Sequence, residues 1–237
     1  TWLPDDSGFF YTRNAWPGTV PGNEEHLHVK VYLHILGENP ESDELIFGAD
    51  RPKDDMIGIT VSPDGKFLGI QVSTTWTENE LYVFDTEAKE IRPIVTNVPA
   101  KFFATFLHDK LLLHTNYKAN NYRVLQSSYE EMHRPVDEWK EFIPERDSAL
   151  ETVRVTESKV LTEYLVNVCS EVHVFDYEGN EVESIPLPTF SSLAGISASA
   201  SEEEFFYGVE SFIFPKTTYR FDPAQQTYAE YRKTHNP

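Results

Sequence analysis

The stretch "VSPDGKFLGIQV" (61–72) contains a complete turn between two segments of strand-forming residues. Pro63 fixes its own φ at the second position of a turn, and Gly65 accepts the left-handed backbone that other residues resist. The flanking segments 56–61 and 66–72 are rich in β-branched and aromatic residues, and turns bound them too closely for helices. The stretch therefore predicts a β-hairpin.

The same order of features recurs along the chain. Residues 80–95, "ELYVFDTEAKEIRPIV", add two more strands to the hairpin, so that residues 56–95 form a four-stranded antiparallel meander. The second strands of five such units begin near Phe9, Phe67, Leu111, Val160 and Phe205. Their spacing of roughly 44 to 58 residues is typical of propeller blades. We therefore predict an all-β fold, a β-propeller of four-stranded antiparallel blades with about five blades.

The repeats fill one predicted propeller domain of residues 1–237. The approximate blade ranges are 1–55, 56–100, 101–149, 150–192 and 193–237. The first copy lacks the counterpart of "DDMIGI" (54–59), so we expect the chain to begin inside a blade, as a piece of something longer. The segment "SSYEEMHRPVDEW" (127–139) predicts one helical turn at most, before Pro135.

Blades bury their two faces against neighbouring blades, so strand aromatics are predicted to lie in the core. These residues are Phe10, Phe67, Phe103, Phe206 and Tyr207. The single cysteine, Cys169, excludes an internal disulfide and is predicted to be a small buried side chain. Cysteine usage leaves the redox compartment undecided, although a cytoplasmic location fits it most simply.

The charge balance excludes two classes of partner. The chain has 39 acidic and 20 basic residues, a formal net charge of −19. Such a surface repels phosphate backbones and anionic lipid headgroups, so we expect neither a nucleic acid nor a membrane as partner. No uninterrupted apolar run approaches the ~18 residues that a membrane-spanning helix needs.

Catalytic motifs are missing from the sequence. The closest approach to Gly-x-Ser-x-Gly is residues 195–199, which end in Ser199 where the motif needs glycine, so Ser197 is not predicted to be a nucleophile. His26 and His28 would share one face of a strand, but no third ligand accompanies them, and an ordinary strand face is favoured. Phosphate-binding glycine loops and zinc patterns are also absent. We expect no catalytic residue, metal or cofactor.

Several stretches together resemble the β-propeller domain of the prolyl oligopeptidase family of serine peptidases. They are "WLPDDSGFFYTR" (2–13), "HLHVKVYLHILGENPESDELIF" (26–47), "MIGITVSPDGKFLGIQVS" (56–73), "TNYKANNYRV" (115–124) and "GVESFIFPKTTYRFD" (208–222). The resemblance extends over nearly the whole chain. The style of insertion and the acidity resemble archaeal members.

The resemblance implies a function for the chain. Members of that family join a seven-bladed propeller to an α/β-hydrolase domain with a Ser-Asp-His triad, and cleave short peptides after proline. The propeller covers the active site and excludes large folded proteins. This chain holds about five of seven blades and no triad. We therefore expect a non-catalytic gating segment, inactive alone, whose partners are the absent hydrolase domain and short peptides.

One loop carries a site prediction from the same resemblance. After the strand that contains "GKFLGIQV", animal members place an Arg and then a Cys that borders the substrate cavity. Those positions correspond to Ser73 and Trp76 in this sequence. The change removes the charge and the thiol, so Trp76 would offer an apolar wall to a peptide side chain; packing within the blade is the alternative.

Two other functions fit the sequence. One is a self-standing propeller that binds a protein or peptide partner on its loop face. The other is an engineered or proteolytic fragment of a propeller. In each case, repeats shaped for seven blades either close into a strained five-bladed ring or leave apolar blade faces exposed, which would promote self-association.

Overall fold

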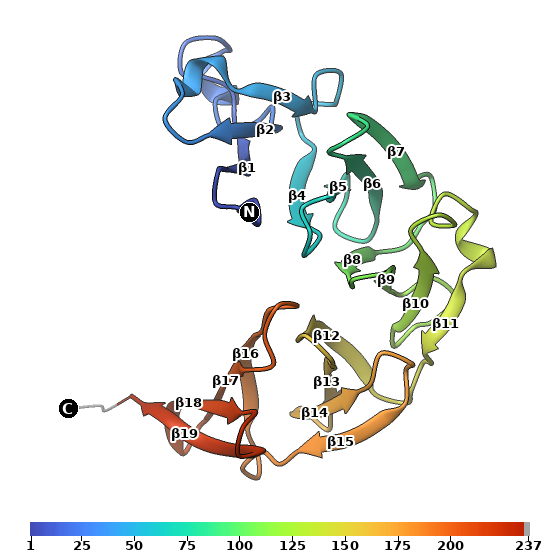
Figure 1. Ribbon diagram of the computed structural model, residues 1–237, viewed down its shortest axis with the longest axis vertical. Coiled ribbons are helices and arrows are strands. Elements are labelled where there is room, and N and C mark those ends of the chain that lie inside the picture. The colour runs from blue at the N-terminus through green and yellow to red at the C-terminus, as the bar shows by residue number, and fades with distance from the viewer. Residues whose placement is uncertain (235–237) are drawn as a thin grey trace. The chain divides into compact units, whose positions relative to one another are not determined.

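The computed structural model describes residues 1–234, which form nineteen β-strands and three short 3-10 helices. Consecutive strands pair into five antiparallel sheets (Figure 1). The prediction of an all-β fold of antiparallel sheets is confirmed. The first sheet consists of β1 (Gly8–Arg13), β2 (Lys30–Ile35) and β3 (Glu44–Phe47), and the second of β4 (Met56–Val61), β5 (Phe67–Ser73), β6 (Asn79–Asp85) and β7 (Glu90–Val95). The third consists of β8 (Phe102–Phe106), β9 (Lys110–Thr115), β10 (Arg123–Ser128) and β11 (Lys140–Ile143). The fourth consists of β12 (Ala149–Val155), β13 (Val160–Val166), β14 (Cys169–Phe175) and β15 (Glu181–Ile185), and the fifth of β16 (Ser192–Ser197), β17 (Phe205–Ser211), β18 (Phe214–Asp222) and β19 (Thr227–Lys233).

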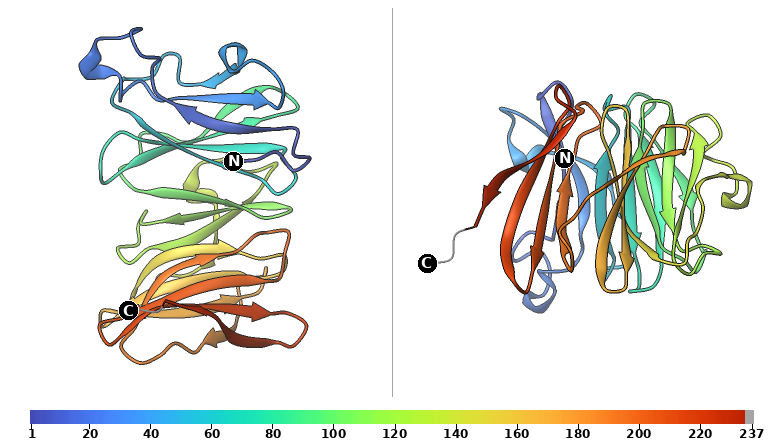
Figure 2. Two further views of the ribbon diagram at one scale, coloured as in Figure 1. Left: turned by 90° about the vertical axis from the view of Figure 1, so that its left-hand side faces the viewer. Right: turned by 90° about the horizontal axis from the view of Figure 1, so that it is seen from below.

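The chain divides into two compact units, and each is described by itself. The first unit comprises Thr1–Tyr117 and Gln126–Lys140, and the second comprises Lys118–Leu125 with the described residues from Glu141 onward. Figure 2 shows the antiparallel strands of the last sheet of the second unit, β16 to β19, in orange to red from two further sides.

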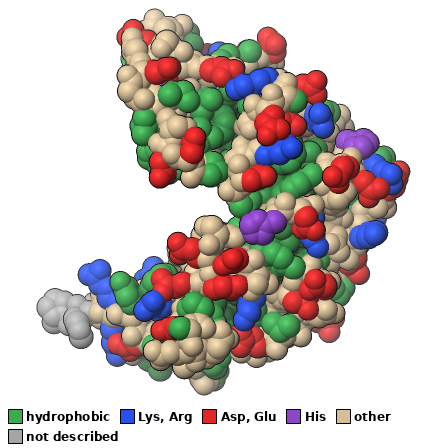
Figure 3. All heavy atoms as spheres, in the orientation of Figure 1, with side chains coloured by type: hydrophobic (Ala, Val, Ile, Leu, Met, Phe, Trp, Pro, Cys, Tyr) green, Lys and Arg blue, Asp and Glu red, His purple; other side chains and the backbone are tan. Residues whose placement is uncertain are grey.

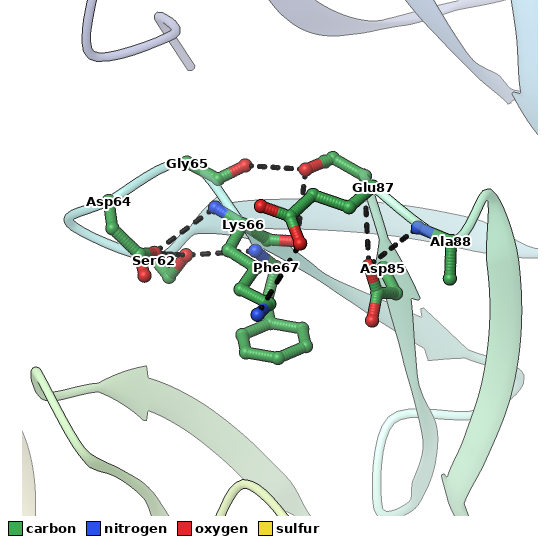
Figure 4. Close-up of polar contacts among 9 residues, drawn as sticks. Ser62, Asp64, Gly65, Lys66, Phe67, Asp85, Glu87 and Ala88 are labelled. Carbon is green, nitrogen blue, oxygen red and sulfur yellow. Dashed lines mark hydrogen bonds and ion pairs between the residues drawn. The ribbon is translucent and has the colours of Figure 1, made fainter.

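The predicted hairpin turn between β4 and β5 is confirmed (Figure 4). Gly65 has φ +73°, and its N–H donates to the carbonyl of Ser62 at 2.9 Å. The Ser62 hydroxyl donates to Asp64 Oδ1 at 2.6 Å and accepts from the N–H of Phe67 at 2.9 Å. Asp64 Oδ1 also accepts from the N–H of Lys66 at 3.1 Å. Side chains of the turn therefore accept hydrogen bonds from backbone N–H groups at the start of the second strand.

The pair Phe-Asp recurs at residues 84–85, 175–176 and 221–222, at or directly after the end of a third strand, and this repetition has a structural cause. Asp85 Oδ1 accepts from the N–H groups of Glu87 and Ala88 at 3.1 and 2.9 Å (Figure 4). Asp176 directly follows β14 and Asp222 ends β18, and both have the same arrangement: each Oδ1 accepts from two backbone N–H groups of the turn that follows. A carboxylate at this position satisfies donors in the turn to the fourth strand, which explains why the pattern recurs.

Each unit has an apolar core between neighbouring sheets. In the first unit the core joins the first two sheets and consists of Phe10, Val31, Ile46, Leu68, Ile70, Val72 and Phe84. In the second unit it joins the last two sheets and consists of Leu161, Val172, Val174, Ile185, Phe205, Tyr207, Val209 and Phe221. These side chains come from alternate strand positions, so each sheet presents an apolar face to its neighbour.

The prediction of the aromatic core is wrong for two of its five residues. Phe10, Phe67 and Tyr207 are buried, whereas Phe103 and Phe206 are half-buried. Phe206 lies on the opposite face of β17 from its buried neighbours, because successive side chains of a strand point to opposite faces. Cys169 was also expected to be buried, but it begins β14 immediately after a turn and is half-buried with a free thiol.

The segment before Pro135 forms only hydrogen-bonded turns, as expected, and a short 3-10 helix follows this residue. The 3-10 helix η3 runs Val136–Glu138, and Pro135 occupies the position before it. Proline suits a helix start because its missing N–H would have no partner there. The other 3-10 helices, η1 (Gly22–Glu24) and η2 (Pro40–Ser42), lie in loops of the first sheet.

The first sheet has three strands, and a single bridge between Trp2 and Phe9 stands where a fourth strand would pair. This agrees with the missing counterpart of residues 54–59 in the first repeat. None of the described helices is long and apolar enough to cross a membrane.

Candidate functional site

The two predicted site residues lie at one end of the second sheet. Ser73 is the last residue of β5, is half-buried and pairs with Met56 and Asn79 on the adjacent strands. Trp76 lies in the loop between β5 and β6, and 85% of its surface is exposed. Within this chain the indole is therefore not covered by neighbouring side chains.

Asn79 fixes the base of this loop. It begins β6, is only 4% exposed, and its N–H donates to the carbonyl of Ala100 at 3.2 Å. Its side-chain amide forms hydrogen bonds with both backbone groups of Phe102, the first residue of β8. The loop that carries Trp76 is thus attached to the next sheet through a buried amide.

A cavity of about 300 Å³ lies beside the loop. It is lined by Thr74, Glu78, Asn79, Glu80, Asn97, Val98 and Pro99. The lining offers carboxylate and amide groups, which can hydrogen-bond a peptide backbone or attract a cationic group. The lining contains no Ser, Cys or His side chain.

A charged network that includes Glu80, one of the lining residues, was not predicted from the sequence. The Arg51 guanidinium contacts Asp55 Oδ2 at 2.7 Å and Glu80 Oε2 at 2.8 Å. Tyr82 donates its hydroxyl proton to Glu80 at 2.8 Å, and Asp55 is only 5% exposed. Burial opposes the charge of Arg51, but hydrogen bonds and attraction from the carboxylates raise the pKa of its guanidinium above the ordinary value. The network holds the start of β4 against β6.

The sequence holds little signal for this network. Arg51 and Asp55 are four residues apart in a loop, and Glu80 lies on another strand. In an acidic chain such pairs are common, so only the fold distinguishes a buried pair from exposed ones. On the face drawn in Figure 3, Asp and Glu side chains are spread among Lys and Arg.

The residues considered for other chemistry are not brought together. Ser197 is exposed at the end of β16. His28 forms a 3.2 Å contact through Nε2 with Glu24, whereas His26 is exposed. Within residues 1–234, no group of three or more His, Cys, Asp or Glu side chains could hold a metal ion.

Apolar side chains stand at loop tips of the second unit. Val168, Phe190, Phe212 and Ile213 each have 80% or more of their surface exposed. Val168 lies between β13 and β14, Phe190 between β15 and β16, and the other two between β17 and β18. Because the strands of each sheet alternate in direction, all three connections lie at the same end of the two sheets. Ser170 and Ser191 join these connections by a backbone hydrogen bond of 3.1 Å.

The loop in the second unit between β13 and β14 has an unfavourable backbone. Val168 has φ +62°, in the left-handed region that a β-branched residue rarely occupies. Asn167 before it has φ +48°, so both residues of the two-residue turn are left-handed, as a type I′ turn requires. An exposed valine is thus held in a conformation that suits glycine.

Residues 1–234 match the family model described as the prolyl oligopeptidase N-terminal β-propeller domain. The chain belongs to this family. The predicted propeller architecture and family are therefore confirmed, and the chain is a propeller segment of the prolyl oligopeptidase type.

Relatives of this propeller are prolyl endopeptidases. The chain is 28% identical over 237 residues to the prolyl endopeptidase of Elizabethkingia meningoseptica, covering 98% of this chain and 33% of the relative. It is 30% identical over 228 residues to that of Elizabethkingia miricola, covering 93% of this chain and 31% of the relative. The propeller thus spans about a third of their length.

A solved structure supports the same family. It comes from a structural and mechanistic analysis of two prolyl endopeptidases, with a TM-score of 0.89, 25% identity and coverage of 98% of this chain and 34% of that one. Further relatives of the propeller come from fungi and from Dictyostelium discoideum. None of these organisms lends support to an archaeal source.

Proposed function

We propose that the chain serves in a longer parent protein as the segment that covers a peptidase active site. In this role it restricts access to short proline-containing peptides and performs no catalytic step. The parent would supply an α/β-hydrolase domain with the nucleophile, base and acid. The observation that carries this proposal is the set of exposed apolar tips, Val168, Phe190, Phe212 and Ile213, at one end of the second unit.

Exposed apolar side chains at turn tips favour a covering partner. Folded monomers rarely gather large apolar groups on one exposed surface, and such patches mark interaction sites. Phe212 and Ile213 are adjacent in a strand connection where polar residues and glycine are usual. The endopeptidase relatives are about three times as long as this chain, so the remaining two thirds of a parent chain is the natural partner.

The loop of Trp76 would face peptide at the corresponding end of the first unit. Its indole is exposed and Ser73 lies at the base of the same loop, beside the cavity lined by Glu78 and Glu80. In this proposal the indole forms an apolar wall for a substrate side chain, and the cavity accepts hydrogen bonds from peptide N–H groups.

The gating role is tested in the parent protein with a double variant, Phe212→Ser with Ile213→Ser. Two substrates carry the same proline-containing sequence, one as a short reporter peptide and one within a folded protein. Loss of the apolar cover should raise cleavage of the folded substrate relative to the short one. Val182→Ser is the control, because Val182 is half exposed but lies in the outer strand β15.

Two results would overturn the proposal. An unchanged ratio between the two substrates in the double variant would show that these tips do not restrict access. Turnover of the reporter by the isolated 237-residue chain, abolished by a serine-reactive inhibitor, would show that the segment is itself catalytic. A protein captured by the isolated chain but not by the parent would favour a self-standing binding scaffold instead.

A further inference from the structure

We propose that a cationic pocket on the first sheet binds the C-terminal carboxylate of a peptide. The pocket is built around Arg13 and Lys30 and is here named the Arg13 pocket. The inference rests on the proposed function, because it names the group by which a parent peptidase would hold the end of a short substrate.

The Arg13 pocket has a volume of about 260 Å³. Its lining includes cationic, aromatic and small side chains but no Asp or Glu: Arg13, Asn14, Ala15, Trp16, Thr19, Val20, His28, Lys30 and Tyr32. In a chain with 39 acidic residues, a pocket lined by two cations and no carboxylate is unexpected. The volume suits a terminal group of a ligand rather than a whole drug-sized molecule.

Arg13 and Lys30 lie directly opposite each other on β1 and β2. Opposite residues of an antiparallel pair present their side chains on the same face, where two like charges destabilise the sheet. Within residues 1–234, no carboxylate lies within ion-pair distance of either cation. Arg51, Arg146 and Arg220 each contact a carboxylate, whereas Arg13, like Arg154 and Arg232, forms no such ion pair in the described structure. A bound anion would reduce the repulsion between these two cations.

The Arg13 guanidinium is held in place before any ligand arrives. Its central carbon lies 4.3 Å from the ring centroid of Trp16 and 4.1 Å from that of Tyr32, so the guanidinium is stacked against both rings. Nη1 donates to the Tyr11 hydroxyl at 3.4 Å, and Nε is buried without a hydrogen-bond partner in the described structure. An arginine fixed by stacking loses little freedom when it binds a planar anion.

A buried carboxylate supports this arrangement from behind. Tyr11 donates to Asp43 Oδ2 at 2.7 Å, and His34 contacts the other carboxylate oxygen at 2.8 Å. Burial, with help from the hydrogen bond to Asp43, raises the pKa of Tyr11 to about 12, so the hydroxyl keeps its proton at neutral pH. Asp43 is engaged by these two partners and does not line the pocket, but its charge also attracts the Arg13 guanidinium and so balances part of the cationic charge.

The chemistry of the pocket favours a carboxylate over a phosphate. The net charge of −19 repels a dianion more strongly than a monoanion. Trp16 and Val20 supply apolar walls for the side chain next to the carboxylate, and Thr19 and Asn14 can hydrogen-bond a peptide group. His28 lies in the same wall but contacts Glu24, which also pairs with Lys53.

The Arg13 pocket lies at the same end of the first unit as the Trp76 loop. The N–H of His28 donates to the carbonyl of Lys53 at 2.9 Å, three residues before β4 begins at Met56. Met56 in turn pairs with Ser73 at the base of the Trp76 loop. A peptide anchored at Arg13 would therefore lie on the end of the sheets where the proposed substrate wall stands.

Titration calorimetry of the 237-residue chain at low salt tests the inference with four probes. These are an N-acetylated tripeptide acid, its C-terminal amide, acetate and inorganic phosphate. The acid should bind at least about tenfold more tightly than the other three, since each 1.4 kcal/mol of lost charged contact is tenfold. Lys30→Gln and Arg13→Lys should each weaken acid binding by about tenfold.

The matched control is Arg92→Gln. Arg92 is an exposed cation paired with Glu90, so its replacement removes one positive charge, as Lys30→Gln does. Circular dichroism and thermal melts check that every variant is folded. Any of four results would overturn the inference. The acid and the amide could bind equally, acetate or phosphate could bind more tightly than the acid, the acid could show no measurable binding, or Arg92→Gln could weaken binding as much as the pocket variants do. The reporter ratio in the parent protein is a separate measurement, so failure here is distinguishable from failure of the gating role.

Discussion

The side-chain amide of Asn79 bridges two sheets by bonding both backbone groups of Phe102. Asn79 Oδ1 accepts from the N–H of Phe102 at 2.8 Å, and Nδ2 donates to its carbonyl at 3.0 Å. Ser170 plays a similar part in the second unit, where its hydroxyl oxygen accepts from the N–H of Leu193 at 2.8 Å. In both cases a polar side chain at the start of a third strand satisfies a backbone donor of the next sheet.

Replacing Asn79 by alanine should destabilise the chain by about 2 to 4 kcal/mol. The substitution leaves the N–H and carbonyl of Phe102 buried without partners, and each unpaired group costs about 1 to 3 kcal/mol. Urea unfolding followed by circular dichroism measures the change. Asn14→Ala, at an exposed position, should change stability by less than about 0.5 kcal/mol. Equal effects of the two substitutions would contradict a role for the bridge.

Gly65→Ala and Gly58→Ala should change stability in opposite directions. Gly65 has φ +73°, and a Cβ there would lie 2.6 Å from Pro4 Cδ, so alanine should cost about 1 to 3 kcal/mol. Gly58 lies in β4 with ordinary φ and open space around a built Cβ, so alanine there should stabilise by about 0.5 kcal/mol. Thermal melts of both variants provide the comparison, and a neutral Gly65→Ala would refute the proposed contact.

The effect of Asp43→Asn should depend on pH. Burial alone would raise the pKa of Asp43, but hydrogen bonds from Tyr11 and His34 outweigh it and lower the pKa below the ordinary value of 3.8. The charged carboxylate therefore stabilises the fold above pH 3.8, and this stabilisation is lost as pH falls through the lowered pKa. At pH 7 the variant should be less stable by about 1 to 2 kcal/mol, because hydrogen bonds to a charged group are lost.

Urea unfolding at pH 7 and near the acid limit of folding checks this dependence. The difference between wild type and Asp43→Asn should shrink at the lower pH. Asp50→Asn, at an exposed position, serves as the control for the general effect of removing a negative charge. A difference for Asp43→Asn that stays constant with pH would mean that its charge contributes nothing.

Val168→Gly should stabilise the isolated chain by about 1 kcal/mol. Glycine accepts the left-handed backbone of this turn without the steric cost that valine carries. In the parent protein, the gating role predicts a loss of function from the same substitution. Without the apolar tip, cleavage of the folded substrate should rise relative to that of the short peptide. Thermal melts and the two-substrate ratio measure these effects, and a less stable isolated variant would contradict the assigned strain.

The isolated chain should self-associate through its apolar tips. Phe212 and Ile213 are almost fully exposed, so the double serine variant should remain as stable as the wild type. Light scattering should show an average mass that rises with concentration for the wild type and stays monomeric for the variant. A wild type that is monomeric throughout, or a variant that associates equally, would rule out these tips as the cause.

Local signals in the sequence predicted the strands well. The turn at Pro63 to Gly65 and the Phe-Asp endings act through contacts within a few residues, so they are visible in sequence. The second strands were expected near Phe67 and Val160, and β5 and β13 begin at these residues. Burial was less predictable, because Phe103 and Phe206 resemble core aromatics but lie on half-open faces.

The candidate sites depend on contacts between distant residues. Arg51 and Glu80 meet only because two strands and a loop bring them together, and Arg13 meets Lys30 through strand register across a long loop. The family resemblance pointed to the Trp76 loop but could not show that the indole is uncovered. Strand patterns carry no information on such pairings, because they repeat in every blade.

The Asp85, Asp176 and Asp222 turns have a consequence for how such chains change in evolution. Each carboxylate accepts hydrogen bonds from the backbone of its own repeat. A connection between sheets such as that of Asn79 needs only one polar side chain and a backbone group of the next sheet. A duplicated gene segment of one repeat length would therefore bring its own turns and a polar side chain that can bond the next sheet. A deletion of the same length would remove one complete unit. Blade number in this architecture is therefore open to change by whole copies.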